Sequence, residues 1–411
     1  MQWRSIIDPG EAAMLEGHDI VCFGPSDWWT MNPSCTTHIM SRLAHANRVL
    51  YVNPFSSDLV SAAVGSGQRR GLGVRMVRKL KSLTRGLRKP APNLHVFSPL
   101  FVPIQGRPVF DAFNDFCLQS QIRGVCRLLR FDRPILWLEN ARASDALSWF
   151  RPQATVYHVS DLFADDSYTS NARKQKAREH RISRGSDLLI CVSRELYERK
   201  RSERDNVRYL PHGVDFELFR QAAERKERLA ELARIPRPIA GYFGTMTAWN
   251  DVEMMVYCAR NLPHVSFVFA GQITAGDYSE LGRLSNVHLL GKLPYEKIPA
   301  LCAGFDVCML QWKMTDWIRN CNPLKMLEYM ASGHPIVSVE IDEAKQYADL
   351  IHIARDKEEF CRAIEWELHN DTPRRRARRI EIAASHSWTH HVERLSELIE
   401  ETIRQKEAGT R

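Results

Sequence analysis

The feature that most constrains the fold is a repeated alternation of short, apolar, β-rich runs with longer segments of helical pattern. Six runs lie in the first half of the chain, at 19–24, 49–54, 94–99, 135–138, 155–159 and 187–193. Six more follow, at 239–244, 265–271, 287–291, 306–311, 335–339 and 351–354. Most runs are continuously apolar rather than alternating, which is typical of parallel strands buried on both faces. Two successive βαβ series therefore predict an α/β protein with two doubly wound, Rossmann-like domains and a cleft between them.

The length of 411 residues also favours two domains, because a single hydrophobic core rarely serves so long a chain. We expect an N-terminal domain over 1–212, a connection over 213–238 and a second domain over 239–385. The last segment, 386–411, has apolar residues at helical spacing. It is predicted as a helix that packs on its own domain or crosses back to the N-terminal one.

Composition points to an ordinary globular protein, with 44% hydrophobic and 26% charged residues. No apolar run approaches the roughly 20 residues of a membrane span, and the first residues lack the pattern of a secretory signal. The ten cysteines are scattered, without a C-x-x-C pair, and several lie inside apolar runs. This usage indicates reduced, buried thiols and a cytoplasmic protein.

The net charge of +8 has a local origin in one basic stretch. Residues 59–110 contain ten Lys or Arg and no Asp or Glu, and nine of the ten lie between residues 69 and 89. On a helical wheel, the leucines of 72–89 fall mostly on one side and the basic residues on the other. Such a helix suits an anionic membrane surface, through Arg75, Arg78, Lys79, Lys81 and Arg85. The alternative is a helix packed on its own domain with solvated charges; nucleic-acid binding is not expected, because interleaved aromatic residues are missing.

The stretch NPLKMLEYMASGHP at 322–335 predicts a short helix with a ligand at its N-terminus. Asn322 suits the N-cap and Pro323 the first helical position, while Gly333 suits the C-terminal cap. Lys325 then lies in the first turn, where a cation is unfavourable unless an anion is bound, and Glu328 follows on the same side. A lysine beside free amides suits a diphosphate, and the glutamate suits ribose hydroxyls. The alternative is a plain ion pair between these two side chains.

A second strand end in this half is GYFGTMTAWND at 241–251. Gly244 and Thr245 follow the apolar run, and a glycine there lets the backbone approach a phosphate closely.

These motifs resemble those of GT-B-fold glycosyltransferases, particularly the bacterial family 4 type. The stretch 322–338 resembles their donor-site motif, PHGVDFELF at 211–219 their hinge-side motif, and 241–255 the first strand, loop and helix of their donor domain. The resemblance implies that Lys325 contacts the donor pyrophosphate and that Glu328, the second glutamate of an E-x7-E element, binds ribose. Asn320 stands where the first glutamate of that element would fall. The first domain would then bind the acceptor and the second the nucleotide sugar.

In the N-terminal half, TVYHVSDLFADD at 155–166 ends a strand with His158 and Asp161. It resembles the Tyr-x-x-Ser-Asp element of the xanthan-pathway glucuronosyltransferase, an inverting GT-B enzyme, which implies that Asp161 is the catalytic base. A turn residue is the alternative for Asp161, and a core histidine for His158. Trp28 and Trp29 are candidates for stacking on an acceptor sugar, or for packing their own loop.

The resulting expectation is a glycosyltransferase that moves a sugar from a nucleoside-diphosphate donor, a UDP-sugar, to a glycan or lipid-linked acceptor in surface polysaccharide biosynthesis. It would lie at the inner face of the membrane. The metal-binding Asp-x-Asp of GT-A enzymes is absent, so neither an obligatory metal nor another cofactor is expected. A GT-B-fold nucleotide-sugar 2-epimerase and a nucleotide-binding membrane scaffold without catalysis are the alternatives.

Overall fold

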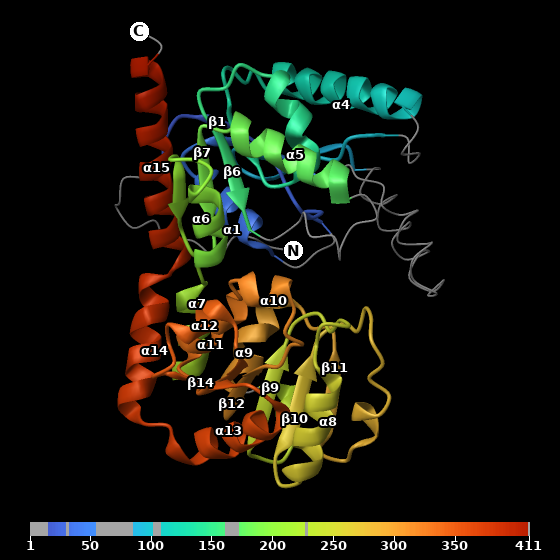
Figure 1. Cartoon of the computed structure of the whole chain (residues 1–411), viewed down its shortest axis with the longest axis vertical. Helices are drawn as coiled ribbons and strands as arrows, with labels where there is room; N and C mark the ends of the chain where they lie inside the picture. Colours follow the sequence, from blue (N-terminus) through green and yellow to red (C-terminus); the bar gives the residue numbers. More distant parts are fainter. Residues whose placement is uncertain are drawn as a thin grey trace. The chain divides into compact units, whose positions relative to one another are not determined.

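The computed structural model describes residues 15–29, 33–54, 85–101, 108–160, 172–226 and 229–409. The chain forms two compact units, which are considered separately here (Figure 1). Unit 1 comprises Met1–Val192, Leu196–Leu210 and His391–Arg411. Unit 2 comprises Ser193–Glu195 and Pro211–His390. The C-terminal residues therefore belong to the same unit as the N-terminal half.

Unit 1 is built on an eight-stranded sheet in the order β3-β4-β2-β1-β5-β6-β7-β8. Every neighbouring pair is parallel except β3 and β4, which are antiparallel. The strands are β1 (Asp19–Phe23), β2 (Arg48–Val52), β3 (Leu87–Ala91), β4 (Leu94–Phe97), β5 (Ile135–Leu138), β6 (Thr155–Val159), β7 (Leu188–Cys191) and β8 (Val207–Tyr209). The central strands β1, β5, β6 and β7 are buried at every residue, which places the core of the unit around them.

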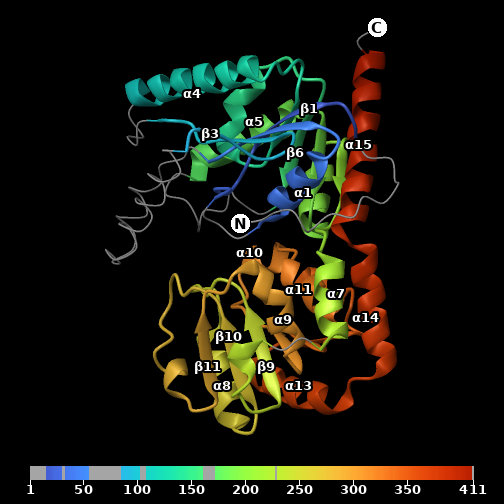
Figure 2. The ribbon, with the colours of Figure 1, turned by 180° about the vertical axis from the view of Figure 1, so that it is seen from behind.

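The helices of unit 1 connect and cover these strands (Figure 2). They are α1 (Cys35–Leu43), α4 (Pro108–Leu128), α5 (Ala172–Gly185), α6 (Arg194–Arg201) and the 3-10 helix η1 (Ala141–Ser148). The last helix, α15 (Trp388–Gly409), begins in unit 2 and lies mostly in unit 1. Its apolar residues Val392, Leu395 and Leu398 are buried, and Lys406 pairs with Asp187 at 2.6 Å, so α15 packs on unit 1 near the start of β7.

Unit 2 has a six-stranded, fully parallel sheet in the order β11-β10-β9-β12-β13-β14. Its strands are β9 (Ile239–Phe243), β10 (Ser266–Ala270), β11 (Val287–Gly291), β12 (Val307–Leu310), β13 (Ile336–Val339) and β14 (Ile351–Ala354). Two groups of helices cover the sheet. One contains α8 (Val252–Asn261) and α13 (Lys357–Asn370), which contact each other; the other contains α7 (Phe216–Glu224), α9 (Ile298–Ala303), α11 (Leu324–Ser332) and α14 (Pro373–Ser385). The short helices α10 (Asp316–Asn320) and α12 (Asp342–Lys345) and the 3-10 helices η2 (Ala230–Leu232), η3 (Leu281–Arg283) and η4 (Tyr295–Lys297) complete the unit.

The predicted α/β fold with two doubly wound, Rossmann-like units is confirmed, and all twelve expected strands are present. The sequence missed two strands, because β3 is polar and β8 is only three residues long. Residues 213–238, expected to connect the domains, instead carry α7, which packs on α9 and α11 within unit 2. The ten cysteines are all free, and eight of them are buried.

The predicted helix over 72–89 is wrong in the part that the structure describes. Residues Leu87–Ala91 form β3, which pairs with β4 through a turn in which Asn93 has a φ of 58°. Gly86 has a φ of 55°, a conformation that interrupts any helix reaching it from the preceding residues. Arg75, Arg78, Lys79 and Lys81 lie outside the described residues.

Candidate functional site

The carboxyl ends of β9 and β12 mark the position in unit 2 where a ligand is expected. These two strands are neighbours, and the chain leads from β9 to β10 on one side and reaches β12 on the other. In a doubly wound sheet, such a reversal of strand order opens a crevice at the carboxyl edge. Gly244 follows β9 directly, and Trp312 follows β12 after one residue.

Gly244 and Lys325 are brought into contact at this point, although 81 positions separate them in the sequence. A Cβ on Gly244 would lie 2.2 Å from Cε of Lys325, and the φ of Gly244 is +134°. A Cβ on Gly271, after the neighbouring β10, would lie 1.8 Å from the carbonyl oxygen of Gly244. Only glycine satisfies the backbone angle of Gly244 and the space left by Lys325, so the close approach predicted from the sequence is built into the strand end.

The ammonium group of Lys325 lies between two aromatic rings. Its Nζ is 5.7 Å from the ring centre of Tyr242 and 5.6 Å from that of Trp312. Over the described part of the chain, no carboxylate oxygen lies within ion-pair distance of this Nζ, so the ion pair with Glu328 is not formed. Cation–π contacts stabilise the lysine only partly, and the positive charge remains available to an anion.

The N-terminus of α11 carries no side-chain cap, in contrast to the prediction that Asn322 is its N-cap. Pro323 occupies that position with an extended backbone, φ −78° and ψ 115°, so the helix begins one residue later. Lys325 therefore remains in the first turn. At the other end Gly333 adopts the left-handed conformation, φ 78°, as its predicted role as C-terminal cap requires.

Glu328 lies one turn further along α11 and is half-buried. The pKa of its carboxyl is raised to about 7, mainly by burial; the charge of Lys325 opposes this rise and the charge of Asp215 adds to it. Asp215 belongs to the stretch 211–219 and occupies the N-cap position of α7 without a side-chain capping hydrogen bond. Its carboxylate accepts a hydrogen bond of 2.9 Å from the hydroxyl of Tyr295. The stretches 211–219 and 322–335 thus lie close together in unit 2.

The two remaining predicted donor-site residues, Thr245 and Asn320, lie in different environments. Thr245 is exposed beside Gly244. Asn320 is buried at the end of α10, and its side-chain amide donates to the carbonyl of Asp316 in the same helix. Its Oδ1 has no hydrogen-bond partner among the described atoms. The Nδ2 group of Asn320 therefore forms a hydrogen bond within α10, while its Oδ1 is a buried acceptor.

Unit 1 has an equivalent reversal of strand order between β1 and β5, and the sequence analysis missed the acidic residue there. Glu139 follows β5 directly and is buried, and its Oε1 lies 3.4 Å from Nδ1 of His158 on β6. Thr36, on α1, donates a short hydrogen bond to Oε2 of Glu139. The only sequence signal was a carboxylate placed immediately after the apolar run 135–138.

The electrostatics of Glu139 show how the pair is held. Burial alone would raise the pKa of this carboxyl, but the charge of His158 and the hydrogen bonds from Thr36 and Ser160 hold the pKa below its usual value. The ring of His158 also packs against Trp137, with ring centres 5.1 Å apart, and both side chains are fully buried. His158 is thus a buried imidazole paired with a carboxylate. This environment favours the alternative prediction, that His158 is a core histidine. Asp161, the predicted base, lies outside the described residues.

The two tryptophans after β1 occupy different environments. Trp28 is only 5% exposed, and its ring packs edge-on against Tyr51 with centres 4.9 Å apart, which favours the loop-packing alternative for this residue. Trp29 is half-buried, and the guanidinium of Arg85 lies 4.9 Å from its ring centre. Arg85, predicted to face a membrane, therefore makes a cation–π contact inside unit 1.

No cluster of three or more His, Cys, Asp or Glu side chains suited to a metal ion occurs in the described ranges. Among the helices in those ranges, none has the length and apolar character needed to cross a membrane.

Comparisons with known proteins agree with this geometry. Residues 247–397, which include the β12 end and all of α11, match the family model described as glycosyl transferase-like. TuaH of Bacillus subtilis (strain 168), which carries the name of a teichuronic acid biosynthesis glycosyltransferase, is 27% identical over 212 residues. That alignment covers 48% of this chain and 52% of TuaH, so the chain matches about half the length of this relative.

Solved structures show the same fold over nearly the whole chain. HepE from Anabaena, crystallised with UDP and glucose, has a TM-score of 0.62 at 14% identity, covering 94% of this chain and 100% of HepE. Sucrose-phosphate synthase from Thermosynechococcus elongatus has a TM-score of 0.68 at 13% identity, covering 95% of this chain and 100% of that enzyme. The fold is GT-B, and the resemblance to GT-B-fold glycosyltransferases is confirmed. The narrower resemblance to the xanthan-pathway enzyme stays a prediction.

Proposed function

We propose that the protein is a glycosyltransferase that moves a sugar from a nucleoside-diphosphate sugar, a UDP-sugar, to a glycan or lipid-linked acceptor in surface polysaccharide biosynthesis. The observation that carries this proposal is Lys325, whose ammonium has no carboxylate partner among the described residues and lies in the first turn of a helix without a side-chain cap, against Gly244 at the strand-order reversal of unit 2. A diphosphate placed there meets the ammonium and the free amides of α11 together. The glycosyl transferase-like match over 247–397 and the name of TuaH support the reaction class and the pathway.

Glu328 serves the ribose in this proposal. Its carboxyl accepts hydrogen bonds from vicinal hydroxyls one helical turn from the diphosphate. Because its pKa is near 7, the carboxyl is mixed in protonation around neutral pH and can also donate to a ribose oxygen. Asn320, which replaces the first glutamate of the E-x7-E element, presents a buried acceptor rather than a carboxylate.

For the transfer step we propose Asp161 as the residue that removes the proton from the acceptor hydroxyl. His158 lies on β6, which ends at Val159, and is paired there with the buried Glu139. Inversion at the anomeric carbon follows if Asp161 acts in this way. No metal enters the proposed reaction.

The test of nucleotide binding uses the full chain with UDP and GDP, followed by thermal stability and calorimetry. UDP is expected to raise the melting temperature, since a ligand that binds only the folded state stabilises it. Lys325→Met should weaken UDP binding by about ten-fold or more, the loss of one charge-assisted contact. Lys226→Met, a change of an exposed lysine just after the C-terminal end of α7, is the control and should bind UDP normally. Unchanged binding in Lys325→Met would refute the assignment.

The reaction itself is tested by following a panel of UDP-sugars by NMR with and without a lipid-linked oligosaccharide acceptor. Release of UDP that requires the acceptor, and that is abolished by Asp161→Asn, is expected. Epimerised nucleotide sugar formed without acceptor would instead establish a 2-epimerase. UDP binding without turnover of any donor would instead support the nucleotide-binding scaffold without catalysis.

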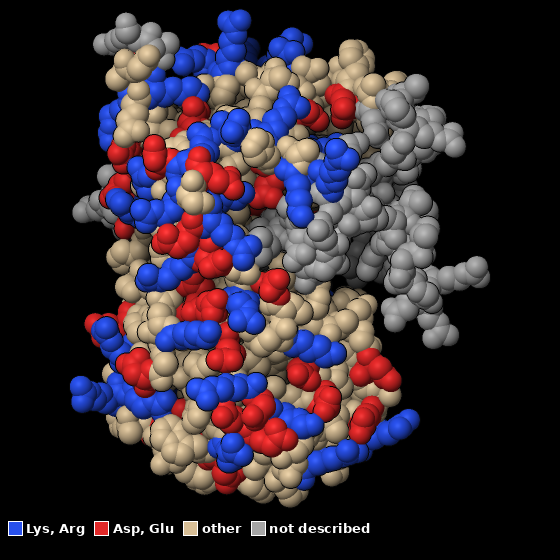
Figure 3. All heavy atoms as spheres, viewed as in Figure 1, with Lys and Arg blue, Asp and Glu red and all other residues tan. Residues whose placement is uncertain are grey.

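We also propose that the protein binds peripherally to the inner face of an anionic membrane through the basic stretch that includes Arg75, Arg78, Lys79 and Lys81. On the face of the described residues shown in Figure 3, basic and acidic side chains are interspersed, so the stretch outside them carries the proposal. Liposomes with anionic lipid should bind the chain in a salt-sensitive way. Replacing Arg78, Lys79 and Lys81 by Glu should abolish that binding. Equal binding to neutral liposomes would refute an electrostatic attraction to the membrane.

A further inference from the structure

A groove of about 410 Å³ lies in unit 2 between β14 and α13, away from the strand end that carries Gly244. Its polar and aromatic lining consists of His352, Arg355, Glu359, Arg362 and Trp366. The strand β14 is the edge of the six-stranded sheet, and both β12 and β13 separate it from β9. The volume lies in the range of small-molecule sites, and nothing in the proposed transfer reaction uses it.

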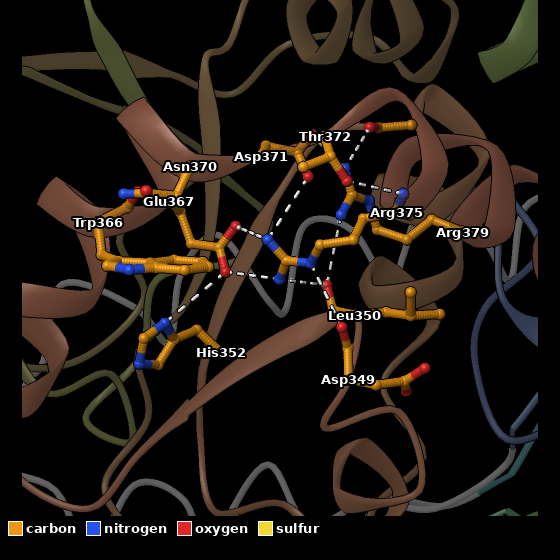
Figure 4. A network of polar contacts seen from close by, with 11 residues as sticks. Asp349, Leu350, His352, Trp366, Glu367, Asn370, Asp371, Thr372, Arg375 and Arg379 are labelled. Atoms are coloured by element: carbon orange, nitrogen blue, oxygen red, sulfur yellow. Dashed lines mark hydrogen bonds and ion pairs between the residues drawn. The ribbon is translucent and has the colours of Figure 1, made fainter.

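An exposed aromatic ring on one wall of the groove is held in a fixed position. Trp366 is 44% exposed, and the ring of His352 meets it edge-on with centres 5.6 Å apart. The guanidinium of Arg375 lies 5.3 Å from its ring centre. Arg375 in turn makes two hydrogen bonds, of 2.7 and 2.9 Å, to the buried carboxylate of Glu367. Figure 4 shows Trp366, His352 and Arg375 grouped around Glu367 in this way.

Two cationic side chains of the groove lack partners. Arg355 and Arg362 are both exposed, and across the parts of the chain that are described neither guanidinium makes a hydrogen bond or an ion pair. The single carboxylate of the lining, Glu359, accepts a hydrogen bond of 3.0 Å from the backbone amide of Arg355. The groove therefore combines an exposed indole with two exposed guanidinium groups that have no partner among the described protein atoms.

The N-terminus of α13, which lies beside the groove, limits which anions can bind there. Asp356 caps α13 and accepts from the amide of Glu359 at 2.7 Å, and Glu358 and Glu359 place two acidic residues in the first turn. A doubly charged phosphate would find that helix end already occupied by carboxylates. A singly charged carboxylate can instead bind to the outward guanidinium groups, which match its geometry.

We propose that this groove is a second carbohydrate site, which binds an acidic saccharide. A pyranose ring packs its apolar face on the indole of Trp366, while the sugar carboxylate accepts hydrogen bonds from Arg355 and Arg362. The site is separate from the nucleotide site and does not depend on the proposed transfer reaction. It gives unit 2 a means of holding an acidic glycan at the edge of its sheet.

The experiment titrates the full chain, saturated with UDP, with a tetrasaccharide of alternating glucuronic acid and N-acetylglucosamine and, in parallel, with neutral cellotetraose. The acidic probe should bind at least about ten-fold more tightly than the neutral one, because a charge-assisted pair is worth roughly that factor. Arg355→Ala, Arg362→Ala and Trp366→Ala should each weaken it by a similar factor. Glu359→Gln should tighten it, because it removes the only carboxylate of the lining.

Arg378→Ala, which changes an exposed arginine on α14, is the control and should bind the probe like the parent chain. The opposite sign of the Glu359→Gln effect separates a charge effect from general damage, and the melting temperature of each variant checks folding. Equal binding of the two tetrasaccharides, parent-like binding by both arginine variants, or weaker binding of the probe to the UDP-saturated chain than to the UDP-free chain would overturn the proposal. So would equally tight binding of inorganic phosphate or a single-stranded oligonucleotide. Failure of UDP to bind would refute only the nucleotide site.

Discussion

Replacing Glu328 by Gln should stabilise the free protein, and by an amount that depends on pH. The carboxyl is half-buried near Asp215, and its pKa is about 7 in the folded chain against an ordinary value of 4.5. Below about pH 4.5 it is protonated in both the folded and the unfolded chain, and ionisation costs nothing. Between pH 4.5 and 7 the unfolded chain releases the proton and the folded chain retains it, so the free energy of unfolding falls as pH rises.

The size of this effect follows from the separation of the two pKa values. Each pKa unit corresponds to about 1.4 kcal/mol, so the folded protein loses up to about 3 kcal/mol from this group by pH 8. Gln has nearly the same shape and cannot ionise. The variant should therefore equal the parent at pH 4.5 and exceed it by as much as about 3 kcal/mol at pH 8, a large share of the stability of an ordinary domain.

The measurement is urea unfolding of the nucleotide-free chain at pH 4.5, 6, 7 and 8, with the unfolding of unit 2 followed separately if the two units unfold in separate steps. Glu296→Gln, which changes an exposed glutamate in the same unit, is the matched control and should show no such trend. A stability difference between Glu328→Gln and the parent that is constant across pH, or that has the opposite sign at pH 8, would refute the argument that burial beside Asp215 raises this pKa. Adding UDP should reduce the advantage of the variant at pH 8 if the carboxylate serves the ribose.

Three further changes test other parts of the structure. Gly244→Ala places a Cβ 2.2 Å from Lys325 at a φ of +134°, so it should cost about 1–3 kcal/mol in urea unfolding and also abolish UDP binding. Glu139→Gln removes a carboxylate whose pKa is held low by His158; the resulting loss of stability should be present at pH 7 and shrink below about pH 4.5, as the parent also becomes protonated. Arg379→Met should cost about 3 kcal/mol or more by calorimetry, because it leaves buried acceptors without their donor.

The sequence predicted the parallel strands well because continuous apolar runs of four to seven residues, bounded by polar segments, have few other uses. It missed β3 because LRKPA is polar, and its strand state depends on pairing with β4 across a turn. The basic and apolar residues before it favoured a helix on the wheel, whereas Gly86 has a φ of 55°, which is not helical. Local pattern therefore identified the interior strands, while edge strands depended on a partner that the pattern does not show.

The residues of the candidate site also differ in whether the sequence alone could identify them. Lys325 and Glu328 could be singled out because they lie in one short helix with recognisable ends. Glu139 could not, because its partners Thr36 and His158 lie 103 and 19 residues away and meet it only once β1, β5 and β6 are side by side. The charge that helps to raise the pKa of Glu328 comes, similarly, from Asp215 on another element.

The position of Lys325 is determined at both ends of the helix that carries it. At the N-terminal end, the missing side chain of Gly244 leaves the space that the lysine occupies. At the C-terminal end, the fully buried Arg379 donates to the carbonyl of Gly333 at 2.9 Å, which links α11 to α14. Arg379 also donates to the carboxylate of Asp371 at 2.6 Å (Figure 4). Because a packed helix moves as a unit, loosening the Arg379 contacts should displace the lysine as well as lower stability. Arg379→Met should therefore weaken UDP binding although it lies at the far end of α11, and normal UDP affinity in a folded Arg379→Met chain would show that Gly244 alone determines the position of the lysine.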